Sequence, residues 1–245
     1  MIIGVIPARY KSSRFPGKPL EDICGKPMVV RVWEQASKAK NLDAIYVATD
    51  DERIEAVCKY HGINVLLTSD KCRTGTDRVA EVAAKFHGDD IYVNIQGDEP
   101  LIDPAAIDWF ILQVSKCSPK YHVFNSMIEV FDPLELINPT VPKVVVNRDS
   151  DAVYFSRAPI PFPKSPLAMS GRCYYKQLGM YAFSAEALSA FAAFEEGILE
   201  AIEGVEILRF IENNWRIKMI SVVSDSIAVD TPDDLQKVRM LFKRP

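Results

Sequence analysis

The sequence of 245 residues is poor in histidine and has no paired cysteines, the residues on which many hydrolases and zinc proteins depend. Its three histidines, His61, His87 and His122, lie far from any serine or cysteine motif, which leaves little for a hydrolase triad. The five cysteines are scattered and odd in number, with no C-x-x-C pair, so structural disulfides and a zinc ribbon are disfavoured. A reducing cytosol fits this cysteine usage. Any enzymatic chemistry must therefore rest on carboxylates, lysine and arginine.

The sequence also lacks a long hydrophobic run and an excess of positive charge. No apolar stretch approaches the roughly 18 residues that indicate a membrane span. With 29 basic and 33 acidic residues the net charge is -4, whereas nucleic-acid-binding proteins are usually basic. Hydrophobic residues make up 48% of the chain, which excludes disorder. We therefore predict a folded cytoplasmic protein with neither a membrane nor a nucleic acid as partner.

The first half of the sequence alternates between strand-like and helix-like segments. Short apolar runs predict strands, and apolar side chains at helical spacing predict helices. The alternation is typical of an α/β fold with a mostly parallel sheet, right-handed crossovers and helices on both faces. Ligands of such sheets bind beyond the carboxyl ends of the strands. The predicted strands are 2–7, 43–49, 63–67 and 91–95, and the predicted helices are 27–39, 51–60, 75–86 and 104–116.

From about residue 120 the pattern becomes richer in strands. A proline-rich loop over 159–166 interrupts it, and no change in composition marks a linker. We therefore predict one continuous domain over residues 1–245, in which the second half, 119–245, adds strands and a substrate lid to the first half, 1–118. The predicted segments are strands at 123–130, 143–147, 152–155, 176–183 and 216–224, and helices at 184–194, 198–213 and 232–242.

A basic loop, PARYKSSRFPGKPL, follows the first predicted strand. It carries Arg9, Lys11, Arg14 and Lys18 and no acidic residue before Glu21. Four cations at the carboxyl end of a strand suit a polyphosphate, because lysine and arginine neutralise its oxygens and backbone N–H groups bind them. The loop is not a Walker A motif, since G-x-x-x-x-G-K-[ST] is absent. A solvated basic loop is the alternative interpretation.

Two aspartates lie where helix capping does not account for them. Asp98 follows the strand at 91–95, and the next helix has a better N-cap in Asp103. Asp230 precedes Thr231, which is itself a sound N-cap for the last helix. Carboxylate oxygens are the ligands that Mg²⁺ prefers. We therefore predict Asp98 as a ligand of a divalent cation and Asp230 as a second ligand.

Three other groups have ordinary structural interpretations. The segment from Arg73 to Arg78 opens a helix that its threonines can cap, although helix N-termini also attract anions. Arg157 ends a strand, where it could bind a carboxylate as a fork or form a surface salt bridge. A charged cluster with helical spacing predicts an exposed face with i,i+3 pairs; its members are Glu200, Glu203, Glu206 and Arg209.

Taken together, seven segments resemble the 3-deoxy-manno-octulosonate (Kdo) cytidylyltransferases, or CMP-Kdo synthetases. They occur in the family's order and cover nearly the whole chain. The first segment and QGDEP are shared more loosely with other sugar nucleotidyltransferases, whereas YFSRAPIP and its spacing to VDTPDDL are much more specific. The segments are PARYKSSRFPGKPL, ATDDERI, TGTDRVAE, NIQGDEP, YFSRAPIP, LGMYAF and VDTPDDL.

The resemblance implies a Rossmann-like nucleotidyltransferase with an added β-rich region for dimerisation and substrate binding. Such an enzyme uses Mg²⁺ and joins CTP to an acidic eight-carbon sugar, releasing pyrophosphate, for assembly of the lipopolysaccharide core. Residues 1–118 would then be the CTP-binding half. Residues 119–245 would bind the sugar, supply the lid and form the homodimer.

The resemblance also implies roles for individual residues. Arg9 and Lys18 would hold the triphosphate, and Asp98 and Asp230 would bind Mg²⁺; these four are the implied catalytic set. In the second half, Arg157 would face the sugar carboxylate, and the implied sugar site also includes Gln177, Tyr181, Glu206 and Ile207. The residues implied around cytidine are Ala8, Gln96 and the turn that contains Arg73, Thr74, Gly75 and Arg78.

Three positions depart from the family pattern. Gln177 stands where the family commonly has histidine, Ile207 where it has glutamine, and Ala228 where it has glycine. A glutamine cannot be charged, and its amide oxygen can accept a hydrogen bond from an ammonium. Ile207 removes a polar partner that a sugar hydroxyl would satisfy. With Glu206 nearby to attract an ammonium, these changes favour the 8-amino-3,8-dideoxy analogue of Kdo.

Ordinary Kdo is the alternative substrate if these changes are neutral. Two further alternatives are a CMP-sialic acid synthetase, which is not expected to carry YFSRAPIP, and a catalytically inactive nucleotide-binding regulator. Such a regulator should lack one of the two metal-binding aspartates. Both Asp98 and Asp230 are present, which favours an enzyme.

Overall fold

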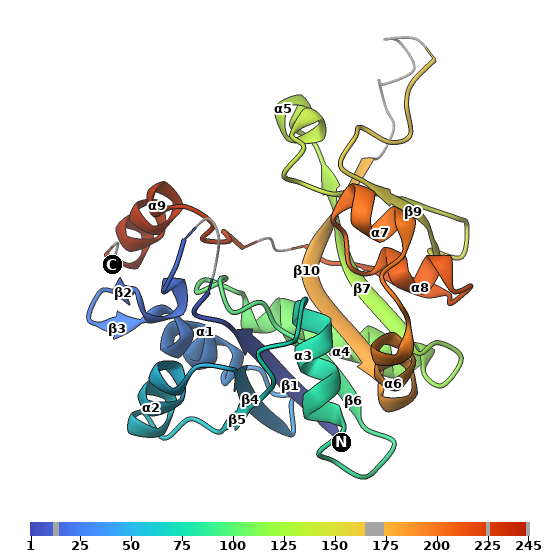
Figure 1. Cartoon of the computed structure of the whole chain (residues 1–245). Coiled ribbons are helices and arrows are strands. Elements are labelled where there is room, and N and C mark those ends of the chain that lie inside the picture. Colours follow the sequence, from blue (N-terminus) through green and yellow to red (C-terminus); the bar gives the residue numbers. More distant parts are fainter. Residues whose placement is uncertain (12–14, 165–173, 224–225, 244–245) are drawn as a thin grey trace.

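One sheet of nine strands runs through the part of the chain that the structure describes (Figure 1). The structure is a computed structural model, and it describes residues 1–11, 15–164, 174–223 and 226–243. Two strands, β8 (Lys143–Val146) and β9 (Ala152–Ser156), extend from the central path, and a separate hairpin pairs β2 (Asp22–Ile23) with β3 (Lys26–Pro27). The central path has the order β11 (Ile217–Ser221), β7 (Val123–Val130), β10 (Tyr174–Ser184), β6 (Ile91–Asn94), β1 (Ile2–Ala8), β4 (Ala44–Thr49) and β5 (Val65–Leu67).

Most neighbours on the central path are parallel. β1 pairs in parallel with β4 and β6, β4 with β5, and β11 with β7. By contrast, β10 is antiparallel to both β6 and β7. The predicted α/β fold with a mostly parallel central sheet is confirmed. The strand β10 joins the strands of the first half of the chain to those of the second, so that both halves contribute to one sheet.

Helices cover both faces of this sheet, and alternate residues of its strands enter two hydrophobic cores. Ile6 of β1 packs into one core, whereas Ile3 and Val5 pack into the other. None of the described helices has the length and hydrophobicity needed to cross a membrane. The first core takes in α1 (Met28–Ala36), α2 (Glu52–Tyr60), α4 (Pro104–Cys117) and α9 (Pro232–Phe242), and the second takes in α3 (Gly75–Ala83), α6 (Ala185–Ala193) and α8 (Leu208–Glu212).

Local sequence signals account for where three helices begin. Thr74 caps α3 in a reciprocal capping box with Asp77, and Thr231 caps α9 in the same way. Asp103 caps α4 by accepting a hydrogen bond from the backbone N–H of Ala105 at 2.9 Å. The predicted N-caps Asp103 and Thr231 are therefore confirmed. The nearby aspartates Asp98 and Asp230 are therefore not the N-caps of these helices.

The predicted helix at 198–213 is wrong, because the structure has two helices there, α7 (Ile198–Glu203) and α8. Gly204 ends α7 with a φ of 60°, which glycine adopts without steric cost. The predicted exposed face is also wrong, since Glu200 and Arg209 are only 4% and 2% exposed. Arg209 donates from Nε and Nη2 to the two carboxylate oxygens of Glu200, at 2.7 and 2.6 Å. It also donates from Nη1 to Asp77 at 3.3 Å, which ties α8 to the first turn of α3.

Segments with weak local signals differ more from the prediction. The helix α5 (Pro133–Ile137) and the β2–β3 hairpin were not predicted, and α1 begins at Met28 because Pro27 belongs to β3. The strand predicted at 216–224 is confined to β11. Arg14 of the basic loop and Pro166 of the proline-rich loop lie outside the described residues.

Candidate active site

Three chain segments meet at the carboxyl edge of the sheet. The turn after β6 comes so close to the end of β1 that a Cβ atom on Gly97 would lie 2.3 Å from the backbone oxygen of Pro7. Only glycine fits this contact, since real Cβ atoms do not approach backbone oxygens so closely. The segment before α9 joins the same turn through a hydrogen bond from the backbone N–H of Val229 to the carbonyl of Asp98, at 2.9 Å. The backbone therefore brings Arg9, Asp98 and Asp230 together from distant parts of the sequence.

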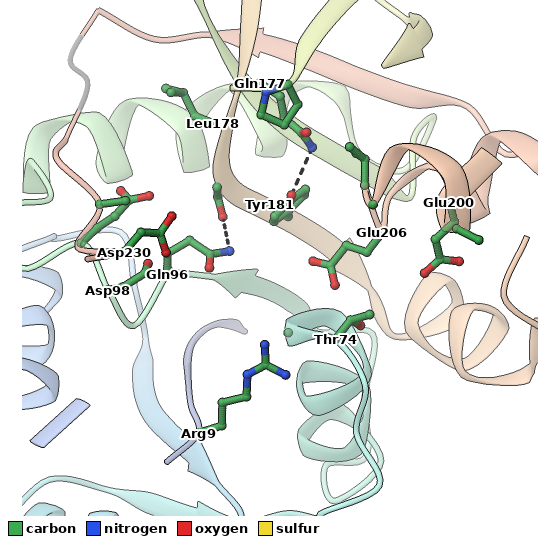
Figure 2. Close-up of a pocket in the computed structure, with 18 of the residues that line it drawn as sticks. Arg9, Thr74, Gln96, Asp98, Gln177, Leu178, Tyr181, Glu200, Glu206 and Asp230 are labelled. Atoms are coloured by element: carbon green, nitrogen blue, oxygen red, sulfur yellow. Dashed lines mark hydrogen bonds between the residues drawn. The ribbon is translucent and has the colours of Figure 1, made fainter. Parts of the chain in front are cut away.

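A cavity of about 530 Å³ opens between these segments and the second half of the chain (Figure 2). A smaller lobe of about 180 Å³ adjoins it and reaches Ala8, Lys18 and Arg78. Figure 2 shows Arg9 pointing into the cavity from the end of β1, with Asp98 and Asp230 on one side and Glu206 on the other. The residues that line both lobes are Arg9, Thr74, Gly75, Gln96, Asp98 and Asp230.

The ammonium of Lys18 lies between the two aspartates. Its Nζ is 2.7 Å from Oδ2 of Asp98 and 3.3 Å from Oδ1 of Asp230. All three side chains are partly buried, so that solvent screens these charges less than it would at the surface. The two carboxylates therefore converge on one position that a cation favours.

These two carboxylates fit a magnesium ion better than a metal that needs a complete protein cage. Among the residues that the structure describes, no group of three or more His, Cys, Asp or Glu side chains could hold a metal ion. Mg²⁺ is commonly bound through one or two carboxylates, and water and substrate phosphates supply its other ligands. Asp98 and Asp230, next to a cavity with a basic loop at its edge, provide that donor set.

The wall formed by the second half of the chain carries polar side chains from β10 and from the loop between α7 and α8. Gln177 donates from Nε2 to the Tyr181 hydroxyl at 3.1 Å, across an irregularity in the pairing of β10 with β7. Gln96 donates from Nε2 to the carbonyl oxygen of Gly179 at 2.8 Å, which connects β10 to the turn after β6 (Figure 2). Gln177 and Tyr181 thus lie at the cavity together with Glu206, as the resemblance implies.

Glu206 is an acidic side chain that faces the cavity. Its carboxylate accepts hydrogen bonds from Oγ1 and the backbone N–H of Thr76, at 3.0 and 3.3 Å. Burial raises the pKa of this carboxyl, although the hydrogen bonds from Thr74 and Thr76 act in the opposite direction. In the described part of the chain, no lysine or arginine forms an ion pair with Glu206. The site therefore offers a partly buried acceptor for a positively charged or hydrogen-bond-donating group.

Two residues that the resemblance placed at the sugar lie elsewhere in the structure. The guanidinium of Arg157 donates to backbone carbonyls of two loops, at 2.9 Å for Pro139 and 3.0 Å for Gly204, and it does not line the cavity. It fastens the loop after α5 to the end of α7. Ile207 is 1% exposed and packs into the second hydrophobic core, because the chain turns after Gly204 and directs it inward.

The two arginines predicted around cytidine, Arg73 and Arg78, lie in different surroundings. Arg78 lines the smaller lobe and forms an ion pair with Asp50 at 3.5 Å. Arg73 is exposed and lines neither lobe; its Nη1 lies 3.0 Å from a carboxylate oxygen of Glu196, a residue of the cavity wall. Of the four residues that the resemblance implies here, Thr74, Gly75 and Arg78 therefore line the cavity or its smaller lobe, and Arg73 does not.

Several lining residues were not singled out from the sequence. Glu99 and Glu196 line the cavity, and so does Glu200, which was interpreted as exposed. Glu99 directly follows Asp98 in the NIQGDEP segment, so its position was the available signal. For Glu196 and Glu200 no local signal exists, because an acidic helix start looks the same on the surface and beside a cavity.

A basic loop faces a pair of aspartates at the carboxyl edge of an α/β sheet, an arrangement of charges that suits the phosphates of a nucleotide. Fold and site together define a nucleotidyltransferase. A family model described as "Cytidylyltransferase" matches residues 3–219, and the chain belongs to that family.

Its relatives are Kdo-type enzymes. The chain is 44% identical over 242 residues to a 3-deoxy-manno-octulosonate cytidylyltransferase of Solibacter usitatus, covering 99% of this chain and 94% of the relative. It is 42% identical over 238 residues to an 8-amino-3,8-dideoxy-manno-octulosonate cytidylyltransferase of Shewanella frigidimarina, covering 96% of both. A solved structure of CMP:2-keto-3-deoxy-manno-octonic acid synthetase complexed with CTP is 39% identical and superposes with a TM-score of 0.90 over 98% of both chains. The names of these relatives therefore differ in the sugar.

Proposed function

We propose that this protein joins CTP to a Kdo-type acidic sugar, giving the CMP-sugar and pyrophosphate for lipopolysaccharide core biosynthesis. Relatives that carry this activity in their names align with nearly the whole chain. The observation that carries the proposal is one cavity bounded by the basic loop and two aspartates on one side and by Gln177, Tyr181 and Glu206 on the other. In the proposed reaction, such a cavity would hold the triphosphate and the sugar next to each other.

In this reaction the anomeric hydroxyl of the sugar attacks the α-phosphorus of CTP, and pyrophosphate leaves in line with the attack. Arg9 and Lys18 bind and neutralise the phosphate oxygens, while Gln96 and the Thr74–Gly75 turn contact the nucleoside. Asp98 and Asp230 would hold Mg²⁺, which supplies positive charge at the phosphates. Catalysis then consists mainly of positioning and of neutralising the charge that develops.

We further propose the 8-amino analogue of Kdo as the preferred sugar. The support is electrostatic, since a buried carboxylate without a cationic partner gains most from a ligand that brings an ammonium. Glu206 is partly buried and has no such partner among the described residues, and Gln177, on the same wall of the cavity, brings no positive charge that would oppose the ammonium. Ile207 gives no support, because it lies in the core. With ordinary Kdo, a protonated Glu206 would instead donate to a hydroxyl.

The test compares pyrophosphate release from CTP with Kdo, its 8-amino analogue and sialic acid. We expect kcat/KM to be highest for the 8-amino sugar, and Glu206→Gln to lower it at least about tenfold for that sugar and less for Kdo. Glu186→Gln changes an exposed carboxylate on α6 and serves as the control. A wild type that prefers Kdo, or equal losses for both sugars in Glu206→Gln, would contradict the 8-amino proposal. A preference for sialic acid, or no release with any sugar, would favour the alternative enzyme or the inactive regulator.

The place of action and the assembly are also proposals. Cys24, Cys58, Cys72 and Cys117 are free thiols, which suits the reducing cytosol. For a homodimer, the support is an exposed apolar segment in the second half of the chain: Phe131, Leu134 and Ile137 are 81%, 71% and 61% exposed. This segment includes α5, which stands away from the body of the molecule beyond the end of β7 (Figure 1). An apolar surface of this kind is typical of a contact with a second copy.

A further inference from the structure

Lys18 forms an ion pair with each of the two aspartates, Asp98 and Asp230, and its position between them has a consequence for metal binding. Its ammonium contacts one oxygen of each carboxylate, at 2.7 Å for Asp98 and 3.3 Å for Asp230. The same two carboxylates are the ones that fit Mg²⁺. In the protein without ligands, the Lys18 ammonium therefore lies at the position between the two carboxylates that a metal ion would take.

The carboxylates are fixed more firmly than the ammonium. The backbone at Asp98 is held by the close contact of Gly97 with Pro7, and the backbone beside Asp230 is held by the hydrogen bond from Val229. Lys18 begins a short 3-10 helix, Lys18–Leu20, whose Pro19 is buried, so that its backbone is also anchored. Its charge, however, sits at the end of a flexible four-carbon side chain. The ammonium can move away while the two carboxylates stay in place.

A lysine and a divalent cation cannot both neutralise this pair fully. Two carboxylates that approach one atom repel each other unless a positive charge lies between them. A cation that enters must displace the ammonium, and without nucleotide the displaced ammonium loses two charged partners and returns to solvent. When a nucleotide is bound, its phosphates provide new partners in the smaller lobe, which Lys18 also lines.

We propose that Lys18 is a positioning residue that holds Asp98 and Asp230 together in the nucleotide-free protein and transfers to the phosphates when the metal and nucleotide bind. This inference rests on the Mg²⁺ site of the proposed function. It makes metal binding weak in the free protein and strengthens it when nucleotide is present. By linkage, the metal strengthens nucleotide binding by the same factor.

The experiment measures Mn²⁺ binding to the full-length protein without nucleotide, by electron paramagnetic resonance of the free ion. We expect Lys18→Met to bind Mn²⁺ at least about tenfold more tightly than the wild type, because the competing ammonium is gone. Lys18→Arg keeps the charge and should bind Mn²⁺ as weakly as the wild type. Lys26→Met removes a lysine that pairs with Glu34 outside the cavity and is the matched control. Lys18→Gln is a second neutral variant, should the methionine variant fold poorly.

Two further measurements complete the test. In EDTA, Lys18→Met should unfold at a lower temperature than the wild type, and Mn²⁺ should raise its melting temperature more than that of the wild type. With a non-hydrolysable CTP analogue present, Mn²⁺ binding should tighten in the wild type and much less in Lys18→Met. A merely structural lysine would lower stability without any gain in metal affinity.

The outcomes separate this inference from the proposed function. Equal or weaker Mn²⁺ binding by both neutral Lys18 variants overturns the exchange of lysine and metal. No Mn²⁺ binding by any variant, with the analogue present, overturns both the exchange and the metal site on which it rests. Tighter binding by Lys18→Met, in a protein whose wild type releases no pyrophosphate from CTP, supports the exchange and overturns only the proposed reaction.

Discussion

At the scale of single residues, the burial of the Glu206 carboxyl makes the stability of the folded protein depend on pH. Burial raises its pKa above the ordinary value of 4.5, so the folded protein binds this proton more tightly than the unfolded chain. The stability from this group is present at low pH and is lost as the pH rises through the folded pKa. We therefore expect Glu206→Gln to be at least as stable as the wild type at pH 8, with a smaller advantage near pH 4.5. Urea unfolding at both pH values measures this; a variant that is destabilised most at pH 8 would contradict it.

The two aspartates test the metal site directly. We expect Asp98→Asn and Asp230→Asn each to lower pyrophosphate release at least about a hundredfold at saturating Mg²⁺, since a neutral amide is a poor ligand for a hard cation. Stability should change by no more than about 1 kcal/mol, because the lost contact with Lys18 is offset by relief of repulsion between the carboxylates. Asp103→Asn, which keeps a good N-cap outside the main cavity, is the control. Near-normal turnover in Asp98→Asn would rule out its role.

Most of the residues predicted from the sequence to form the site do line the cavity, but some do not. Asp98 and Asp230 stood out because Asp103 and Thr231 explain the helix starts beside them, and both now lie at the cavity. Arg157 does not line the cavity, because a guanidinium at a strand end can equally well bind carbonyl groups of neighbouring loops. Which of these partners it meets depends on segments distant in sequence, and no local pattern reports them.

At the scale of secondary-structure elements, a buried ion pair fastens α7 and α8 to α3. Arg209 bonds to both oxygens of Glu200 and to Asp77, and its guanidinium lies over the ring of Phe191, 3.9 Å from the ring centre. The same first turn of α3 carries Thr74 and Gly75 into the cavity. The contact therefore holds the first turn of α3 against the part of the cavity wall that α7 and the loop after it form.

We expect Arg209→Met to destabilise the protein by about 3–5 kcal/mol, because it leaves the Glu200 carboxylate buried without its counter-charge. The double variant Arg209→Met with Glu200→Met should recover most of that loss, since it removes both charges and keeps the volume. Urea unfolding of the two single variants and the double variant gives the coupling energy. Strictly additive losses would show that the pair does not act as a unit.

Elements with strong local signals were predicted well, and those set by distant contacts were not. The helix α9 has the predicted bounds, because a threonine cap, a proline and two aspartates mark its start. The break between α7 and α8 was missed, since an apolar pattern at helical spacing continues across Gly204. The place of β10 between β6 and β7 also has no local signal, because strand order depends on pairing between remote segments.

At the scale of the whole molecule, the exposed apolar segment around α5 predicts that two copies of the chain form a dimer. We expect the wild type to sediment as a dimer and Phe131→Asp with Ile137→Asp to sediment as a monomer, since a charge in an apolar interface costs several kcal/mol. Analytical ultracentrifugation measures this. Tyr60→Asp alters an 86% exposed side chain on α2, in the first half, and should leave the dimer intact. A wild type that is monomeric at micromolar concentration would contradict the proposal.

The antiparallel strand β10 also sets the order in which the protein can be completed during synthesis. β6 pairs with β1 on one side and with β10 on the other, and β10 ends only at Ser184. Until the ribosome has released that residue, one edge of β6 has no neighbouring strand and exposes unpaired backbone groups. The first half of the chain therefore cannot finish its sheet before β10 has emerged, and the nascent chain needs protection from aggregation for that interval.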